Sequence, residues 1–208
     1  MTLNANGALH RRTALLAIAY ALAFVFAAWL DLSTTALALT RAGASEGNVY
    51  ATTPDGYAAA RAWLITGLGG VVVEGYLLFG ALNAGKAAEV WLQRPIRSFA
   101  KFYINPFARS VIDRSPIHAL SFVIAFVPLR MLAALNNIAI YATGDAPLGR
   151  LVGYAGRLTT PTIGFWLVMG TLFYLLAFGV SPIAASLIRW LRRPGGDAAG
   201  VETPVFHA

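Results

Sequence analysis

Residues 13–35 read TALLAIAYALAFVFAAWLDLSTT, and this stretch decides the fold class. Its first part, residues 13–30, is a continuous apolar run, and about 20 such residues are enough for a helix to cross a bilayer. We therefore predict a first membrane span over residues 13–39, preceded by a polar lead over residues 1–12. The span ends in a polar sequence that starts at Asp31. An ionisable group at membrane depth normally faces a partner or a cavity, because its transfer into lipid costs roughly a few kcal/mol.

A cleaved secretory signal peptide is an alternative interpretation of this first run. Basic residues precede the run, and small residues such as Ala27 and Ala28 near its end are typical of a cleavage site. The run is longer than a usual signal core, and the later spans need a helix to pack against. We therefore expect the first span to remain in the protein.

The composition indicates a membrane protein of one domain. The chain has 208 residues, of which 58% are hydrophobic and 12% are charged, whereas a typical soluble domain has about 25% charged residues. The net charge of +7 comes mostly from residues that flank apolar runs, as in cytoplasmic loops, so nucleic acid is not the expected partner. The chain has no cysteine, which excludes disulfides, thiolate metal sites and thiol nucleophiles.

Three further apolar stretches complete the predicted fold, an all-α polytopic membrane protein with four transmembrane helices. These spans lie at residues 62–83, 117–141 and 161–183. A short surface helix is expected over residues 148–158, and the fourth helix is expected to continue to Trp190. Residues 1–191 then form one membrane domain. The tail, residues 192–208, is rich in Gly, Pro and Ala and is expected to be disordered in the cytoplasm.

The connection between the second and third spans, residues 84–116, is the most basic part of the chain. Its membrane-surface cations are Lys86, Arg94, Arg97, Lys101, Arg109 and Arg114. Aromatic residues alternate with these cations, and residues 97–103 have the pattern of an amphipathic segment that lies in the headgroup layer against anionic lipid. The N-terminal lead and residues 189–193 are basic too, and Lys and Arg concentrate on the cytoplasmic side of a membrane. We therefore expect both termini in the cytoplasm and the protein in the inner membrane of a bacterial cell.

Polar side chains inside the spans predict one buried polar cluster. Glu74 and Arg130 lie near the middle of the second and third spans, so an ion pair between them at the bilayer midplane is the natural inference. Asp31 is expected roughly 8 Å further out, and Asn137 shares a helix face with Arg130 because seven residues separate them. The complete predicted cluster is Asp31, Thr34, Thr35, Thr66, Glu74, Arg130, Asn136 and Asn137.

This cluster has two interpretations. In the first it is structural, because polar side chains that hydrogen-bond across helices determine their register. In the second it forms a ligand pocket, an ion path or a catalytic site, with Asp31 as a base or a cation ligand. The sequence holds no nucleophile motif, phosphate-binding loop or zinc-ligand spacing, so we predict no catalytic or metal-binding residue, and the cofactor is unknown. His118 is interpreted as an interfacial side chain rather than a haem or metal ligand.

The polar sequence DLSTT from Asp31, then Gly43, then Glu46-Gly47-Asn48, resembles a domain-of-unknown-function family of small multi-pass bacterial and archaeal membrane proteins. In that family's pattern an aspartate and a threonine near a helix end precede a glycine and then Glu-x-Asn-Pro, and an asparagine lies late in the third span. The resemblance covers roughly residues 13–141, and Val49 stands where the family has its proline. It implies no activity. It implies joint action of Asp31, Thr35, Glu46, Asn48 and Asn137.

Three functions are compatible with these features. The lack of recognisable catalytic chemistry and the glycine-rich second span favour a non-enzymatic accessory or scaffold subunit of a membrane complex, with other membrane subunits or further copies of the chain as partners. A small transporter or an ion-conducting homo-oligomer would use Glu74, Arg130 and Asp31. An intramembrane enzyme on a lipid substrate would use Asp31 and Glu46 with a divalent cation.

Overall fold

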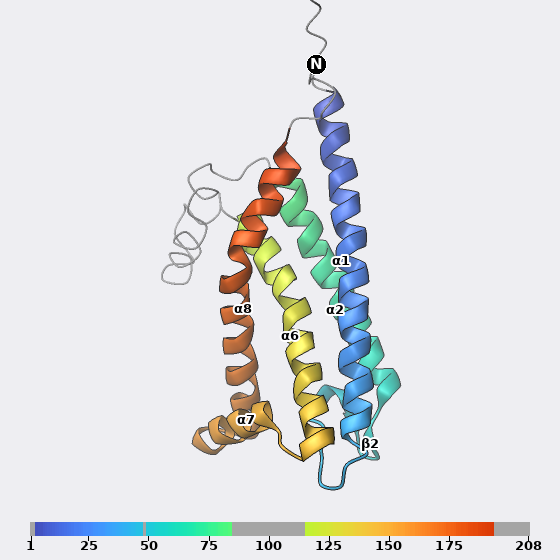
Figure 1. Cartoon of the computed structure of the whole chain (residues 1–208), viewed down its shortest axis with the longest axis vertical. Helices are drawn as coiled ribbons and strands as arrows, with labels where there is room; N and C mark the ends of the chain where they lie inside the picture. The colour runs from blue at the N-terminus through green and yellow to red at the C-terminus, as the bar shows by residue number, and fades with distance from the viewer. Residues whose placement is uncertain (1–2, 48, 85–114, 194–208) are drawn as a thin grey trace, which may run out of the picture.

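The computed structural model describes residues 3–47, 49–84 and 115–193, and this part of the chain is almost entirely helical (Figure 1). Its helices are α1 (Leu3–Ala38), the 3-10 helix η1 (Val49–Ala51), α2 (Ala59–Leu82), α6 (Ser115–Thr143), α7 (Pro147–Leu158) and α8 (Pro161–Arg192). Two short strands, β1 (Thr52–Thr53) and β2 (Gly56–Tyr57), pair antiparallel in the connection between α1 and α2.

Four of these helices, α1, α2, α6 and α8, are long and apolar enough to cross a membrane. This confirms the predicted all-α fold with four transmembrane-length helices, and it is consistent with a multi-pass integral membrane protein. The short surface helix predicted over residues 148–158 is α7, which begins one residue earlier at Pro147. Proline suits the first turn of a helix because the backbone N–H that it lacks has no partner there.

The first and last long helices extend further than predicted. The sequence suggested a polar lead over residues 1–12, but α1 already begins at Leu3, and α8 continues to Arg192. Helical backbone satisfies its own polar groups, and no proline interrupts this lead. The extension also has a tertiary reason, because Arg12 Nη1 donates to the carbonyl oxygens of Trp190 (3.1 Å), Leu191 (3.4 Å) and Arg193 at the end of α8.

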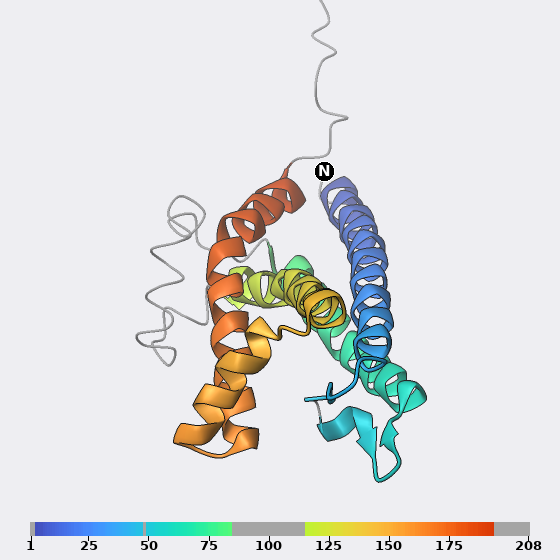
Figure 2. The ribbon, with the colours of Figure 1, turned by 60° about the horizontal axis from the view of Figure 1, so that its bottom comes forward.

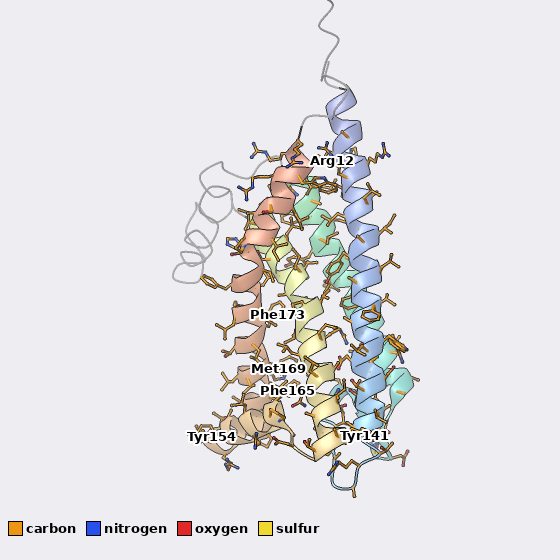
Figure 3. The ribbon with its side chains drawn as sticks, in the orientation of Figure 1. Arg12, Tyr141, Tyr154, Phe165, Met169 and Phe173 are labelled. Carbon is orange, nitrogen blue, oxygen red and sulfur yellow. The ribbon has the colours of Figure 1, made fainter. Side chains whose placement is uncertain are left out.

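Helix α6 lies in the middle of the molecule, with α1 and α2 on one side and α8 on the other (Figure 2). The C-terminal part of α8 turns toward the beginning of α1 in this view, and Pro182 lies inside that helix. A proline inside a helix removes one backbone hydrogen bond and permits such a bend. We name the end of the bundle where Arg12 lies the N-terminal end, and the opposite end, with Tyr141 and Tyr154, the α7 end (Figure 3).

The main apolar core lies toward the N-terminal end and joins all four long helices. Its members with no exposed surface are Leu77, Ala81, Ala84, Ile117, Leu120, Ala184, Ala185 and Ile188. Gly80 allows α2 to approach α6 there, since a Cβ at this position would lie 2.9 Å from Leu120 Cγ. A second cluster, around Ala125 and Ala177, joins α6 to α8.

Several sequence predictions lie outside the described residues. They concern Asn48, the tail from residue 194 onward, and the membrane-surface cations Lys86, Arg94, Arg97, Lys101, Arg109 and Arg114.

Candidate functional site

Arg130 of α6 connects three helices. Its Nη1 atom lies 2.9 Å from Oδ2 of Asp31 on α1, and its Nη2 atom donates to Oγ1 of Thr66 on α2 at 3.1 Å. The guanidinium carbon also lies 5.2 Å from the ring centroid of Phe24, within the distance at which a cation is attracted to an aromatic face. One side chain therefore links α6 to both α1 and α2.

Asn137, two turns further along α6, forms a second connection to α1. Its Nδ2 atom donates to Oγ1 of Thr35 at 2.8 Å, and it lies 3.4 Å from the carbonyl oxygen of Asp31 and 3.5 Å from Oγ1 of Thr34. The two threonine hydroxyls donate to carbonyl oxygens of α1 itself, those of Leu30 and Asp31, at 2.8–3.0 Å. Their protons are thus used within α1, and their oxygens accept from Asn137.

We name these six residues the polar clamp: Asp31, Thr34, Thr35, Thr66, Arg130 and Asn137. The side chains of Asp31 and Arg130 are only 17% and 20% exposed, so both charged groups are largely buried inside the protein. A buried pair is tolerated when its geometry is good and additional hydrogen bonds satisfy its remaining groups. The clamp meets both conditions, and its direct physical effect is to determine the register of α1, α2 and α6.

The predicted pair between Glu74 and Arg130 is wrong, because the partner of Arg130 is Asp31. Glu74 follows Thr66 by eight residues on α2, which places it about 12 Å further toward the N-terminal end than the atoms that Arg130 contacts. The prediction assumed that the midpoints of the spans lie at one level. The hydrogen bond between Asn137 and Thr35 shows that these two residues lie at about the same level. Arg130, seven residues earlier on α6, is then level with residue 28 of α1. Asp31 lies three residues from that level, about 4.5 Å along the helix axis, and is therefore within reach of Arg130.

Glu74 thus lies outside the clamp. It is half-buried on α2, and the structure shows no hydrogen bond or ion pair for it within the described part of the chain. The buried Tyr20 hydroxyl of α1 donates to the carbonyl oxygen of Val123 on α6 at 2.8 Å, not to Glu74.

Asn136 was also predicted to belong to the buried cluster, and its observed role differs. Its Oδ1 atom accepts a hydrogen bond from the backbone N–H of Leu148 at 3.0 Å. That N–H lies in the first turn of α7, where no intrahelical acceptor exists, and the N-cap residue Ala146 offers no side-chain acceptor. Adjacent helix residues point about 100° apart, so Asn136 serves α7 while Asn137 serves α1.

The connection after α1 brings further polar groups toward the clamp. Burial raises the pKa of Tyr57 in β2, and the nearby carboxylates of Glu46 and Asp31 raise it further. Glu46 therefore lies within electrostatic range of the same hydroxyl as Asp31. Asn48, the other residue of the loop motif, lies outside the described residues.

Two residues of the site carry no distinct signal in the sequence. Phe24 covers the Arg130 guanidinium, and Gly70 makes room for this ring, since a Cβ there would lie 3.0 Å from Phe24 Cε1. An aromatic residue inside a long apolar run carries no distinct signal, and the glycine was one of several on α2. His118, expected at the membrane interface, is buried near the start of α6.

The described residues hold no group of three or more His, Cys, Asp or Glu side chains that could bind a metal ion. A groove of about 310 Å³ lies between α7 and α8, away from the clamp, and its lining is apolar. Comparisons with protein-family models, with curated proteins and with solved structures found no match to this chain, so the resemblance stated from the motif around Asp31 stays a prediction.

Proposed function

We propose that this chain is a non-enzymatic accessory or scaffold subunit of a membrane complex. The polar clamp supports a structural role for the intramembrane charges. Asp31 and Arg130 neutralise each other, and Thr66 and Phe24 occupy further positions around the guanidinium. Polar groups that pair with one another across helices in this way hold the helices in register.

The observation that carries the proposal is Glu74. A carboxyl group on a transmembrane-length helix, without an ionic partner among the described residues, is expected to meet one in another molecule. The same side of α2 carries Gly67, at which a Cβ would have no neighbour within 4 Å, and the exposed Leu78. A helix of another subunit could approach closely at Gly67 and offer a cation or a hydrogen-bond donor to Glu74.

The proposed location is the inner membrane of a bacterial cell, with both termini in the cytoplasm. The N-terminal end carries Arg11, Arg12, Arg189, Arg192 and Arg193, which supports this orientation by the distribution of cations. Because the chain has no cysteine, Ser45→Cys provides a single label site at the α7 end. Reaction of intact spheroplasts with a membrane-impermeant maleimide is expected, and protection until the membrane is lysed would reverse the orientation.

The subunit role is tested by native mass spectrometry of the tagged chain after mild extraction from its source membrane. We expect the wild type to carry a membrane protein in fixed stoichiometry. We expect Glu74→Gln to lose most of this bound partner. Asp55→Asn, which removes a carboxylate from an exposed turn, is the matched control and should keep the partner. Thermal melting of each purified variant separates loss of the partner from loss of the fold.

Two results would overturn the proposal. One is a wild-type chain that is recovered only as a monomer. The other is a homo-oligomer whose ion flux in proteoliposomes disappears in Glu74→Gln, because this would establish the transporter alternative instead.

A further inference from the structure

The corner between α7 and α8 is closely packed. A Cβ on Gly164 would lie 2.3 Å from the backbone nitrogen of Gly156, so the two helices meet here through backbone contact. Thr160 begins α8 by accepting a hydrogen bond from the N–H of Ile163 at 3.2 Å. The corner positions α7 across the end of α8 (Figure 1).

Beyond this corner the two helices separate and enclose the apolar groove of about 310 Å³. Leu151 and Tyr154 line it from α7, and Leu167, Thr171 and Leu172 line it from α8. The volume lies at the lower end of the range of small-molecule sites. Its lining offers almost nothing to a polar ligand, so the occupant must be apolar where it enters the groove.

The apolar face of α7 is open as well. Leu151, Tyr154 and Leu158 recur at helical spacing and are 54%, 59% and 70% exposed. A short helix with one apolar face and cations elsewhere typically lies in the headgroup layer with that face toward the acyl chains. The groove therefore opens at the depth where lipid chains begin.

A cation lies at this groove. The Arg157 guanidinium lies 5.9 Å from the ring centroid of Tyr154, which lines the groove. The other arginine of α7 differs, because Arg150 pairs with Asp145 at 3.0 Å. Arg157 has no ion pair within the described part of the chain, so its charge is available to an anion.

We propose that the groove between α7 and α8 binds one acyl chain of an anionic phospholipid, and that Arg157 binds the phosphate of the same molecule. The groove selects a chain by its shape, and the arginine selects a negatively charged headgroup. The lipid comes from the leaflet in which α7 lies. This inference is independent of the proposed subunit role.

The test titrates the purified full-length chain with phosphatidylglycerol or phosphatidylcholine of identical acyl chains, and counts bound lipid by native mass spectrometry. The wild type should bind one phosphatidylglycerol more tightly than phosphatidylcholine, by about fivefold, which is the effect expected for one basic residue on an anionic lipid. Arg157→Gln should bind both lipids equally. Arg61→Gln is the charge-matched control, because Arg61 is an exposed arginine at the same end that contacts Thr52.

The groove itself is tested by Leu167→Trp, which should abolish the single tight site for both lipids. Leu175→Trp, at an exposed position of α8 outside the groove lining, should leave this site intact. If Leu167→Trp does not fold, Thr171→Leu adds apolar volume in the same groove and should weaken binding. The proposal fails if the wild type shows no preference, if Arg61→Gln reduces the preference as much as Arg157→Gln, or if filling the groove leaves binding unchanged.

Discussion

The two sides of α6 are held by different chemistry. Toward α1 and α2, the helix presents Arg130 and Asn137, which make directed polar contacts at 2.8–3.1 Å. Toward α8, it presents Phe122 and Phe126, whose rings lie 5.7 and 4.7 Å from that of Phe173. The aromatic contact lies beside the small buried residues Ala125 and Ala177.

This difference shows that the register of a membrane helix against its neighbours can be determined in two ways. Lipid tails are as apolar as leucine, so apolar contact alone gives little preference for one helix register over another. Directed hydrogen bonds and close shape complementarity supply that preference. The α1–α2–α6 side has the directed hydrogen bonds as well as the close approach at Gly80, whereas the α6–α7–α8 side has aromatic packing and the Gly156–Gly164 contact.

The largest expected effect is on the clamp. Arg130→Met should destabilise the protein by about 3 kcal/mol, at the lower end of the range for breaking a buried ion pair, because Asp31 keeps some exposure. The double variant Asp31→Asn/Arg130→Met should be more stable than the sum of the single losses predicts. The free energy of unfolding, measured by denaturant titration in mixed micelles, checks both statements.

Glu74→Gln is the internal control for this cycle. It removes a carboxyl from α2 that contacts no member of the clamp, so we expect its effects to add independently to those of Arg130→Met. Strong coupling between Glu74 and Arg130 would contradict the assigned ion pair.

A change at the corner of α7 and α8 should have the next largest effect. Gly164→Ala places a Cβ against the backbone of Gly156 and should cost about 2 kcal/mol, as overpacking does in a well-packed site. Gly170→Ala, on the same helix with open space around its Cβ, should be neutral or slightly stabilising. Equal melting temperatures for the two variants would show that the corner is not closely packed.

Asn137→Ala tests the smaller part of the clamp. It removes the hydrogen bond to Thr35, and interhelical hydrogen bonds in membranes contribute roughly 0.6 kcal/mol each, with a maximum near 1.7. Asn136→Ala should instead loosen the first turn of α7. Hydrogen exchange read peptide by peptide distinguishes them, since faster exchange at residues 147–150 is expected only for Asn136→Ala.

The smallest effect concerns the connection next to the clamp. Because the pKa of Tyr57 is raised in the folded protein, this residue contributes stability below the pKa of the unfolded chain, and the contribution disappears as the pH rises through the folded value. Glu46→Gln should lower the pKa of Tyr57 toward its ordinary value. Ultraviolet titration of the phenol, with Tyr57→Phe for assignment, measures the shift. An unchanged pKa of Tyr57 in Glu46→Gln would show that the Glu46 carboxylate does not act on Tyr57.

Much of the fold and part of the site could be predicted from the sequence. The four apolar runs identify the long helices because helix length and hydrophobicity are local properties, and the short helix expected over residues 148–158 is α7. The polar residues inside the spans also predict part of the site, since Arg130 contacts Asp31 and Thr66, and Asn137 contacts Thr35. The cost of a charge in lipid is a property of the residue and its depth, so the sequence is enough to predict that such groups need partners.

Which groups become partners was decided only by the tertiary structure. The offset of α2 along α6 places Thr66 at the guanidinium and leaves Glu74 about 12 Å beyond Thr66 along the helix axis, and the offset of α1 brings Asp31 to the guanidinium instead. The positions of Phe24 and Gly70, the use of Asn136 by α7, and the groove beside Arg157 depend in the same way on helix rotation and offset. Rotation and offset result from the packing of all helices together, whereas an apolar run in the sequence determines only that a helix forms and about how far it extends.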